Sequence, residues 1–169
     1  ALQLLGGAER KMILETSRLI LRPWTAEDAP ELFKYASDPG IGPAAGWAAH
    51  KSVEESSAVI DGVLSAPGTF AVVLRETGLP VGSVGIVRPP RVPGAGENEA
   101  ELGCWLGRPY WGRGLIPEAL GRLLESCFFE LGCEAVWYCW YDGNDKSRRV
   151  GEKLGFTYHH SEENVDCPL

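Results

Sequence analysis

A short segment with two glycines, Trp111-Gly112-Arg113-Gly114-Leu115, separates an apolar run from a longer stretch of helical periodicity. Glycine lets the backbone turn tightly, so that consecutive N–H groups can face one anion. A helix beginning here would add its unpaired N-terminal N–H groups and its dipole, and Arg113 would add positive charge. The pattern predicts a phosphate-binding turn, although a glycine pair before a helix is by itself more often a structural turn.

The two common nucleotide-binding motifs do not fit this turn. A Walker loop needs Gly-Lys-Ser/Thr, which the sequence lacks. A dinucleotide fingerprint needs a third glycine, and Pro117 stands at that position. The turn therefore indicates a different phosphate-bearing ligand.

Periodicity predicts the elements that position the turn. Alternating residues before it indicate a strand at 98–106, and the pattern after it indicates a helix at 115–131 that ends at Gly132. The other expected elements are strands at 17–24, 69–76, 81–88, 134–141 and 156–160, and helices at 25–38, 52–65 and 145–154. The order β-α-α-β-β-β-α-β-α-β predicts an α/β fold with a mixed sheet.

The composition is that of a single globular domain. The chain has 169 residues, of which 23 are acidic and 16 basic, for a net charge of −7. We expect one domain over residues 12–169, with residues 1–11 as an N-terminal extension or a cloning remnant. The acidic balance argues against nucleic acid as a partner, because phosphate binding needs clustered Lys and Arg.

Cysteine usage and hydropathy bear on the compartment. The five cysteines are odd in number and none are spaced as CxxC, which argues against disulfides and against a zinc site. Cys127 and Cys133 are expected to pack in the core. No apolar run reaches the roughly 20 residues that span a bilayer. We therefore expect a cytoplasmic protein with no membrane or metal partner.

The glycine turn belongs to LGCWLGRPYWGRGLIPEAL, and three further segments accompany it in order: LETSRLILRPWTAEDAPELF, AELGCWLG and GNDKSRRVGEKLGF. Together they resemble the GNAT superfamily of N-acetyltransferases, and most closely its RimJ/RimL-like ribosomal-protein-alanine acetyltransferase branch. The turn resembles the family's acyl-CoA pyrophosphate motif, and the last segment resembles its Asn-x-x-Ser helix. Four motifs in register are much more specific than one.

The resemblance implies transfer of acetyl from the cosubstrate acetyl-CoA to a primary amine, directly within a ternary complex. It also implies that the fourth and fifth strands splay apart, so that pantetheine lies between them. The main chain at Trp105, Leu106 and Gly107 would pair with pantetheine. The pyrophosphate would be held by Gly112, Arg113, Gly114, Leu115 and Ile116.

Three side chains match catalytic or ligand-contacting positions of the family. Glu101, in Ala-Glu-Leu-Gly, matches the candidate general base, whereas on residue type alone it would be a solvated strand carboxylate. Ser147 matches the hydroxyl near the thiol sulfur, and Asn144 matches the amide that contacts pantetheine. Both could simply cap the following helix, and Asn144 could do both.

The acceptor site would lie near Trp47 and His50. Trp47 could wall the pocket, while His50 could be a second proton carrier or only a solvated loop residue. For Tyr138 and Tyr141, packing in the core or on a sheet face is the favoured interpretation.

Two departures from the family pattern stand out. Pro109 replaces the usual Gln or Arg before the first glycine, which should cost little because main-chain N–H groups carry most of that binding. The family usually adds one more strand after the segment that matches residues 156–165, whereas the sequence ends at Leu169. The strand is absent, supplied by a partner, or cut off from this sequence, and an open sheet edge would favour a homodimer.

Three functions remain open at this level. The first is an acetyltransferase that acts on a protein N-terminus or a small amine. The alternatives are a non-catalytic acyl-CoA-binding sensor and an interaction module that dimerises through its sheet edge. The presence of both Glu101 and Ser147 favours the enzyme.

Overall fold

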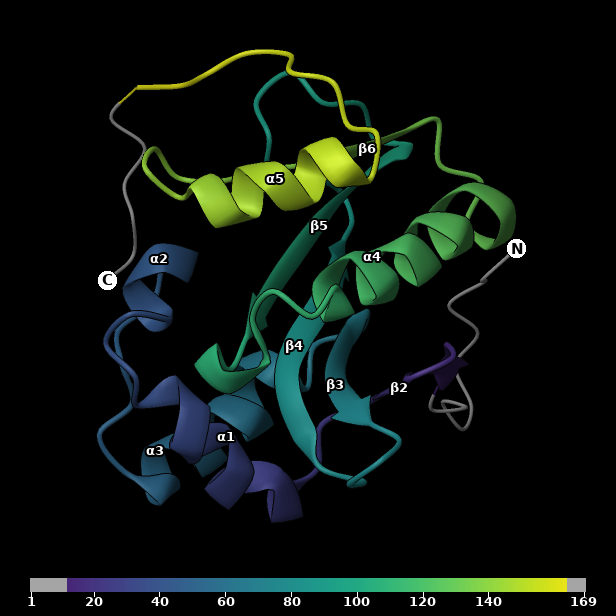
Figure 1. The fold of residues 1–169 in the computed structure, drawn as a ribbon. Helices are drawn as coiled ribbons and strands as arrows, with labels where there is room; N and C mark the ends of the chain where they lie inside the picture. The colour runs from purple at the N-terminus through teal and green to yellow at the C-terminus, as the bar shows by residue number, and fades with distance from the viewer. Residues whose placement is uncertain (1–11, 164–169) are drawn as a thin grey trace.

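The computed structural model describes residues 12–163, so residues 1–11 and 164–169, with the expected N-terminal extension, lie outside it. Within the described range one sheet has the strand order β1-β2-β3-β4-β5-β6 (Figure 1). All neighbours are antiparallel except β5 and β6, which are parallel. The strands are β1 (Leu14–Glu15), β2 (Leu19–Arg22), β3 (Thr69–Leu74), β4 (Pro80–Val87), β5 (Glu99–Leu106) and β6 (Ala135–Tyr138).

The helices connect these strands and cover the sheet. They are α1 (Ala29–Ala36), α2 (Gly42–Ala45), α3 (Val53–Val59), α4 (Leu115–Glu125) and α5 (Asp145–Lys153). α3 and α4 continue as π-helical turns over Ile60–Leu64 and Ser126–Glu130. No helix among the described residues is long and apolar enough to cross a membrane.

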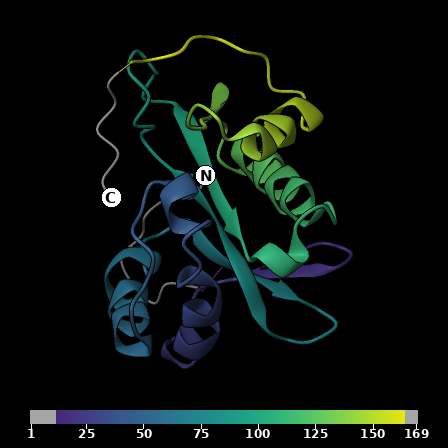
Figure 2. The same cartoon turned by 60° about the vertical axis from the view of Figure 1, so that its left-hand side comes forward.

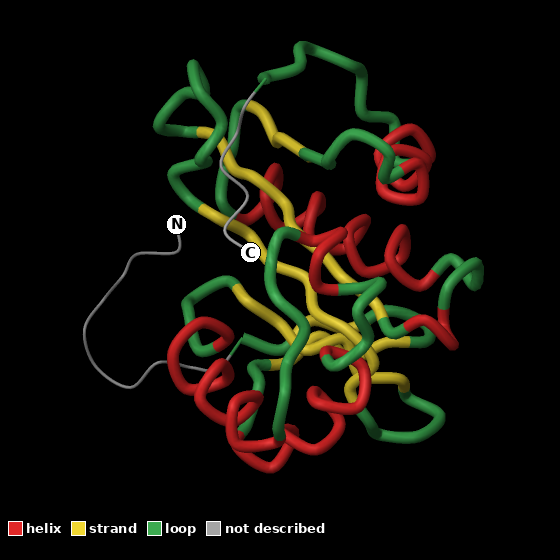
Figure 3. The backbone as a smooth tube through the Cα atoms, turned by 90° about the vertical axis from the view of Figure 1, so that its left-hand side faces the viewer, coloured by secondary structure: helices red, strands yellow, loops and turns green. Residues whose placement is uncertain are grey.

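The sheet separates two groups of helices and two apolar cores. Figure 2 shows α1 and α3 on one side of the sheet and α4 and α5 on the other, and Figure 3 shows the strands as the layer between them. The larger core, with Leu102 and Leu120, lies under α4. The smaller core, with Leu32 and Ile60, lies under α1 and α3. Alternate side chains of a strand therefore face different surroundings.

The expected α/β fold with a mixed sheet is confirmed, but the strand expected at 156–160 is wrong. Gly155, at φ +85°, turns the chain after α5, and residues 156–163 form no strand. Of this segment only Phe156 packs against the core, and residues 157–163 are exposed. A strand here would bury no apolar face, so nothing compensates its ordering.

Smaller differences concern the ends of elements. A short strand, β1, precedes the first expected one, and α2 forms inside the expected loop. β6 ends at Tyr138, whereas the aromatic pattern continues to Tyr141. Cys127 and Cys133 are buried, as expected.

Candidate active site

β5 loses one neighbour halfway along its length, and the site is built around this point. β6 pairs with β5 from Glu99↔Ala135 to Leu102↔Tyr138. On the other edge, β4 stays paired with β5 as far as Leu106. Residues 103–106 therefore have no strand partner on the β6 side among the described residues. This open edge is where the resemblance led us to expect pantetheine.

Cys104 and Leu106 are the residues whose main-chain groups face the open edge. The carbonyl oxygen of Trp105 lies against β4, and the Gly107 N–H donates to a carbonyl of β4 over 2.8 Å. Successive residues of a strand point their N–H and C=O groups in opposite directions, so those of 104 and 106 point away from β4. Of the three expected pantetheine contacts, only Leu106 thus presents its main chain to the opening.

Trp111 joins the loop after β5 to both β5 and α5. Its indole N–H donates to the carbonyl oxygen of Leu106 over 2.8 Å. The Nζ of Lys146, on α5, lies 3.5 Å from the centre of the Trp111 ring. Arg108 in the same loop pairs with Asp38, and its hydrogen bonds lower the pKa of that carboxyl to about 2. The loop that carries the glycine turn is therefore tied to its surroundings.

The glycine turn has the backbone conformation that the sequence predicts. φ is +73° at Gly112 and +74° at Gly114, a region that favours glycine. Gly114 is the N-cap of α4, so the first N–H groups of that helix have no intrahelical partner. The turn can therefore present N–H groups to an anion.

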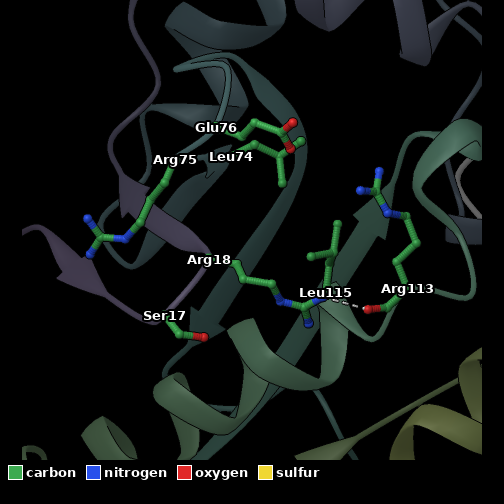
Figure 4. A pocket seen from close by; sticks show the side chains of 7 residues that line it. All are labelled: Ser17, Arg18, Leu74, Arg75, Glu76, Arg113 and Leu115. Atoms are coloured by element: carbon green, nitrogen blue, oxygen red, sulfur yellow. Dashed lines mark hydrogen bonds between the residues drawn. The ribbon is translucent and has the colours of Figure 1, made fainter.

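Arg18, just before β2, holds the turn from behind. Its Nη1 donates to the carbonyl oxygen of Arg113 over 2.9 Å, and its Nη2 lies 2.6 Å from the Glu118 carboxylate of α4. Figure 4 shows Arg18 reaching that oxygen while the Arg113 guanidinium points away from it. Arg18 and Arg113 are among the residues that line a hollow of about 240 Å³. The charge of Arg113 is exposed, whereas that of Arg18 is used to fix the turn.

The N-terminus of α5 brings Asn144 and Ser147 together. Asn144 is the N-cap of α5, as expected, and its Oδ1 accepts from the Ser147 N–H over 3.1 Å. Its Nδ2 donates to the carbonyl oxygen of Ala44 in α2 over 3.2 Å. Both side-chain polar atoms of Asn144 therefore bond within the protein, and the residue links α5 to α2.

Ser147 has a buried phenol beside it. Its Oγ lies 2.7 Å from the Oη of Tyr138, the last residue of β6. Tyr138 packs in the larger core, as expected, and burial raises the pKa of its hydroxyl. The pair lies where β6 separates from β5, so Ser147 lies at the end of the open edge that is next to β6.

Glu101 lies on the opposite face of β5. Side chains at 101, 103 and 105 leave the strand away from Leu102 and Cys104. The Oε2 of Glu101 accepts from the main-chain N–H of Arg91 over 2.9 Å and lies 3.6 Å from the Arg91 Nε. The Glu101 side chain is only 13% exposed. It is therefore a fixed and largely screened carboxylate, not a freely solvated one.

Trp47 and Trp105 wall a hollow of about 190 Å³ on the Glu101 face. Their rings meet edge to face with centroids 5.7 Å apart. Gly103 lies between them and Glu101 along the strand, and a Cβ there would meet no atom within 4 Å. The other lining residues are uncharged: Ala45, Leu64, Thr69, Ser83, Val84, Gly85 and Cys104. The hollow is small, aromatic and apolar.

His50 supports this wall from behind. Its ring centre lies 5.3 Å from that of Trp47, and its Nδ1 lies 2.8 Å from the Ser56 Oγ of α3. Burial lowers the pKa of His50, which favours the neutral ring. One ring nitrogen is thus engaged with α3 rather than with the hollow.

The structure gathers the expected residues around the end of β6, but from two sides. Ser147 approaches on the α5 face, while Glu101, Trp47 and Trp105 lie on the other face. No sequence pattern predicts the contacts of Arg18 or Arg91, and for Tyr138 the sequence predicts only packing. Strand alternation places Tyr138 on the same face as Leu102, but its contact with Ser147 depends on how α5 packs.

Comparisons with known proteins point to one family. Residues 18–157 match a family model described as acetyltransferase (GNAT) domain. The uncharacterized N-acetyltransferase p20 of Bacillus licheniformis is 30% identical over 128 residues, which cover 73% of this chain and 70% of that protein. A Bacillus subtilis protein provisionally named ribosomal N-acetyltransferase YdaF is 40% identical over 60 residues, 36% of this chain and 33% of that one.

A solved structure shows the same fold. It is an acetyltransferase of the GNAT family from Bacillus anthracis, 23% identical in sequence, with a TM-score of 0.75. The match covers 85% of this chain and 82% of that one.

Proposed function

Because the chain belongs to the GNAT family of acetyltransferases, in its RimJ/RimL-like branch, we propose that it transfers an acetyl group from acetyl-CoA to a primary amine. The open edge of β5 is the observation that carries this proposal. Main-chain groups of Cys104 and Leu106 face it, and the glycine turn follows β5 directly. A ligand with amide groups along its length and a pyrophosphate at one end suits this arrangement.

The residues that would hold such a ligand follow from these placements. Leu106 would pair with pantetheine, with Trp105 and Gly107 shaping the strand that presents it. The turn and the first residues of α4 would hold the pyrophosphate: Gly112, Arg113, Gly114, Leu115 and Ile116. Asn144 would act mainly by positioning α5.

Two side chains would handle the proton and the charge. Glu101 would accept the proton of the attacking amine, and Ser147 would donate a hydrogen bond to the leaving thiolate. The N–H of Cys104, which faces the opening, would stabilise the negative charge on the acyl oxygen. Acetyl-CoA supplies the acetyl group as a thioester. Glu101 and Ser147 lie on opposite faces of the sheet. The amine and acetyl-CoA can therefore be bound at the same time, which favours direct transfer in a ternary complex.

For the acceptor we propose a protein N-terminus with a small first side chain. The hollow beside Trp47 and Trp105, about 190 Å³, is smaller than typical pockets for drug-sized ligands, which hold roughly 300–1,000 Å³. A polyamine or an aminoglycoside would bring further ammonium groups, and burying them without a partner is costly. None of the residues lining the hollow is charged. The name of the ribosomal relative also supports a protein acceptor.

A non-catalytic acyl-CoA-binding module is the alternative. It would keep the glycine turn but would need neither a carboxylate nor a hydroxyl at the opening. The restrained Glu101 and the paired Ser147 favour the enzyme over this module.

The compartment, the oligomeric state and the domain bounds are also part of the proposal. Four cysteines of the described chain are free thiols, which suits the reducing cytoplasm. β6 is the last strand of the sheet, and its outer edge could pair with a second copy to form a homodimer. We also propose that residues 12–169 form one domain.

Calorimetry with acetyl-CoA tests the first step of this function. We expect micromolar binding, about −8 kcal/mol, and much weaker binding of ATP, which has phosphates but no pantetheine. Acetylation of peptides that begin with Ala or Ser would then be followed by mass spectrometry, with N-terminally blocked peptides as controls. Binding without transfer would favour the non-catalytic module, and absence of binding would contradict both.

A further inference from the structure

We propose that Tyr138, supported by Cys104, positions the hydroxyl of Ser147 toward the sulfur of the leaving thiol. This inference rests on the proposed function, because Ser147 has a thiol to face only if CoA binds at the opening. It assigns a task to a tyrosine that sequence reasoning treats as core packing.

The three polar atoms form a short chain across three elements. The Oη of Tyr138 on β6 lies 2.7 Å from the Oγ of Ser147 on α5 and 3.5 Å from the Sγ of Cys104 on β5. Leu102↔Tyr138 is the last pair of β5 and β6. The chain of atoms therefore spans the point where the two strands part, beside the open edge.

The directions of these hydrogen bonds follow from chemistry. Burial raises the pKa of both the Tyr138 hydroxyl and the Cys104 thiol, so both keep their protons. Either atom of each pair can be the donor by geometry. We assign Tyr138 as the donor to Ser147 and the acceptor from Cys104, because a hydroxyl oxygen is a better acceptor than a thiol sulfur. One lone pair of the Ser147 Oγ is then engaged, and the hydroxyl proton is free to point elsewhere.

Packing keeps the Tyr138 ring in place. Gly151 of α5 is buried beneath it, and a Cβ there would lie 3.0 Å from the Tyr138 ring. Phe156 and Trp140 lie beside the ring, with centroids 5.6 and 6.3 Å away. Because the ring cannot swing, its hydroxyl holds Ser147 in one orientation, as supporting residues do in preorganised sites.

In the proposed step Ser147, Tyr138 and Cys104 all keep their protons. The amine nitrogen forms a bond to the acetyl carbon and its proton goes to Glu101. The carbon–sulfur bond breaks and its electron pair stays on sulfur. Ser147 donates a hydrogen bond to the thiolate and keeps its proton, because a proton drawn from Tyr138 would leave a buried phenolate. Tyr138 is thus a positioning residue.

The ionisation of bound CoA tests this assignment without acetyl transfer. The ultraviolet absorbance of the CoA thiolate is followed against pH, with the complex of desulfo-CoA as the blank for the protein's own thiols and phenols. We expect the thiol pKa of bound CoA to lie below that of free CoA. Ser147→Ala should raise it by about one unit, and Tyr138→Phe should raise it by about half as much.

Tyr35→Phe is the matched control. Tyr35 is also buried, and its hydroxyl lies 3.1 Å from that of Tyr110. It belongs to α1, on the other side of the sheet from α5 (Figure 2). This variant loses a similar hydroxyl pair and should leave the bound thiol unchanged. An equal shift in Tyr35→Phe, or none in Tyr138→Phe, would overturn the inference.

Steady-state kinetics provide a second readout. Tyr138→Phe should lower kcat about threefold, as expected from half a pKa unit, with the KM for acetyl-CoA unchanged, while the ring and its packing stay. In a double variant, Tyr138→Phe should add nothing to Ser147→Ala, because it acts through that hydroxyl. Additive losses would show that Tyr138 acts elsewhere. If CoA does not bind at all, the proposed function fails; if CoA binds and no variant shifts the thiol, only this inference fails.

Discussion

The two faces of β5 next to the open edge are built in different ways. On the α5 face, Asn144, Ser147 and Tyr138 are joined by hydrogen bonds of 2.7–3.1 Å. On the other face, Glu101 is a restrained carboxylate, and the hollow beyond Gly103 has an uncharged lining of mainly aromatic and small side chains. Hydrogen bonds have directions, whereas apolar walls select only by size. We infer that the first face suits a constant group, the thioester, and the second a variable one, the acceptor.

Removing the carboxylate of the second face should have the largest effect. Glu101→Gln keeps the shape but cannot accept the amine proton, so kcat should fall on the order of 100-fold. The affinity for acetyl-CoA, measured by calorimetry, should not change. Glu99→Gln is the control, because Glu99 lies two positions away on the same face and binds the Trp137 indole over 2.5 Å. Equal losses in the two variants would argue against a base at 101.

Straining the glycine turn should weaken the binding of acetyl-CoA and leave the acceptor site unaffected. Gly112→Ala forces a side chain into φ +73°, at a cost of about 1–2 kcal/mol. Reorganisation of the turn to relieve this strain should weaken acetyl-CoA binding about tenfold.

A hairpin glycine provides the control for this strain. Gly78 has φ +70°, and a Cβ at either glycine would meet no atom within 4 Å. Gly78→Ala should therefore lower the urea midpoint about as much as Gly112→Ala does, but it should leave acetyl-CoA binding intact. Similar binding losses in both variants would mean that the effect comes from stability.

Filling the hollow should affect the acceptor alone. Gly103→Val adds a side chain to open space at a strand position that tolerates it. We expect the KM for an Ala-initiated peptide to rise about fivefold, since the loss of one small apolar contact is worth roughly 1 kcal/mol. The acetyl-CoA affinity serves as the internal reference. A change in that affinity with no change in the peptide KM would reverse the assignment of the two faces.

The anchoring of the turn from behind should show itself in acid. Burial acts to raise the pKa of Glu118, but hydrogen bonds from Thr16, Arg18 and Ser17 outweigh it and hold the value at about 2. An unfolded chain ionises this carboxyl near its ordinary value of about 4.3. Its stabilisation is therefore complete above that pH and is lost as the pH falls toward 2.

Urea unfolding at a series of acidic pH values measures this effect. The midpoint of the unaltered chain should fall more steeply across that range than the midpoint of Glu118→Gln. Glu125→Gln, at an exposed position of the same helix, should behave like the unaltered chain. Identical slopes for all three would show that Glu118 does not stabilise the turn.

Local features of the site could be predicted from the sequence because short-range geometry decides them. The left-handed conformations of Gly112 and Gly114 follow from residue type and from the helix that begins after them. The cap by Asn144 depends only on the backbone of its own helix. The alternation along β5, which separates Glu101 from Cys104, follows from the pleat of any strand.

Strand ends could not be predicted in the same way. The aromatic run at 134–141 would suit a longer strand, yet β6 ends at Tyr138. Residues 156–160 resemble a strand in composition, but all of them except Phe156 remain exposed. A strand exists only where a neighbour and a buried face are available, and neither is encoded within the segment itself.

The sequence by itself determined most of the elements, the glycine turn, the helix cap and the family to which the chain belongs. The tertiary structure alone decided that Ser147 meets Tyr138, that Asn144 holds Ala44 and that Arg91 holds Glu101. It also decided which residues of β5 face the open edge. The first group depends on interactions within a few residues, whereas the second depends on how elements distant in the chain pack against one another.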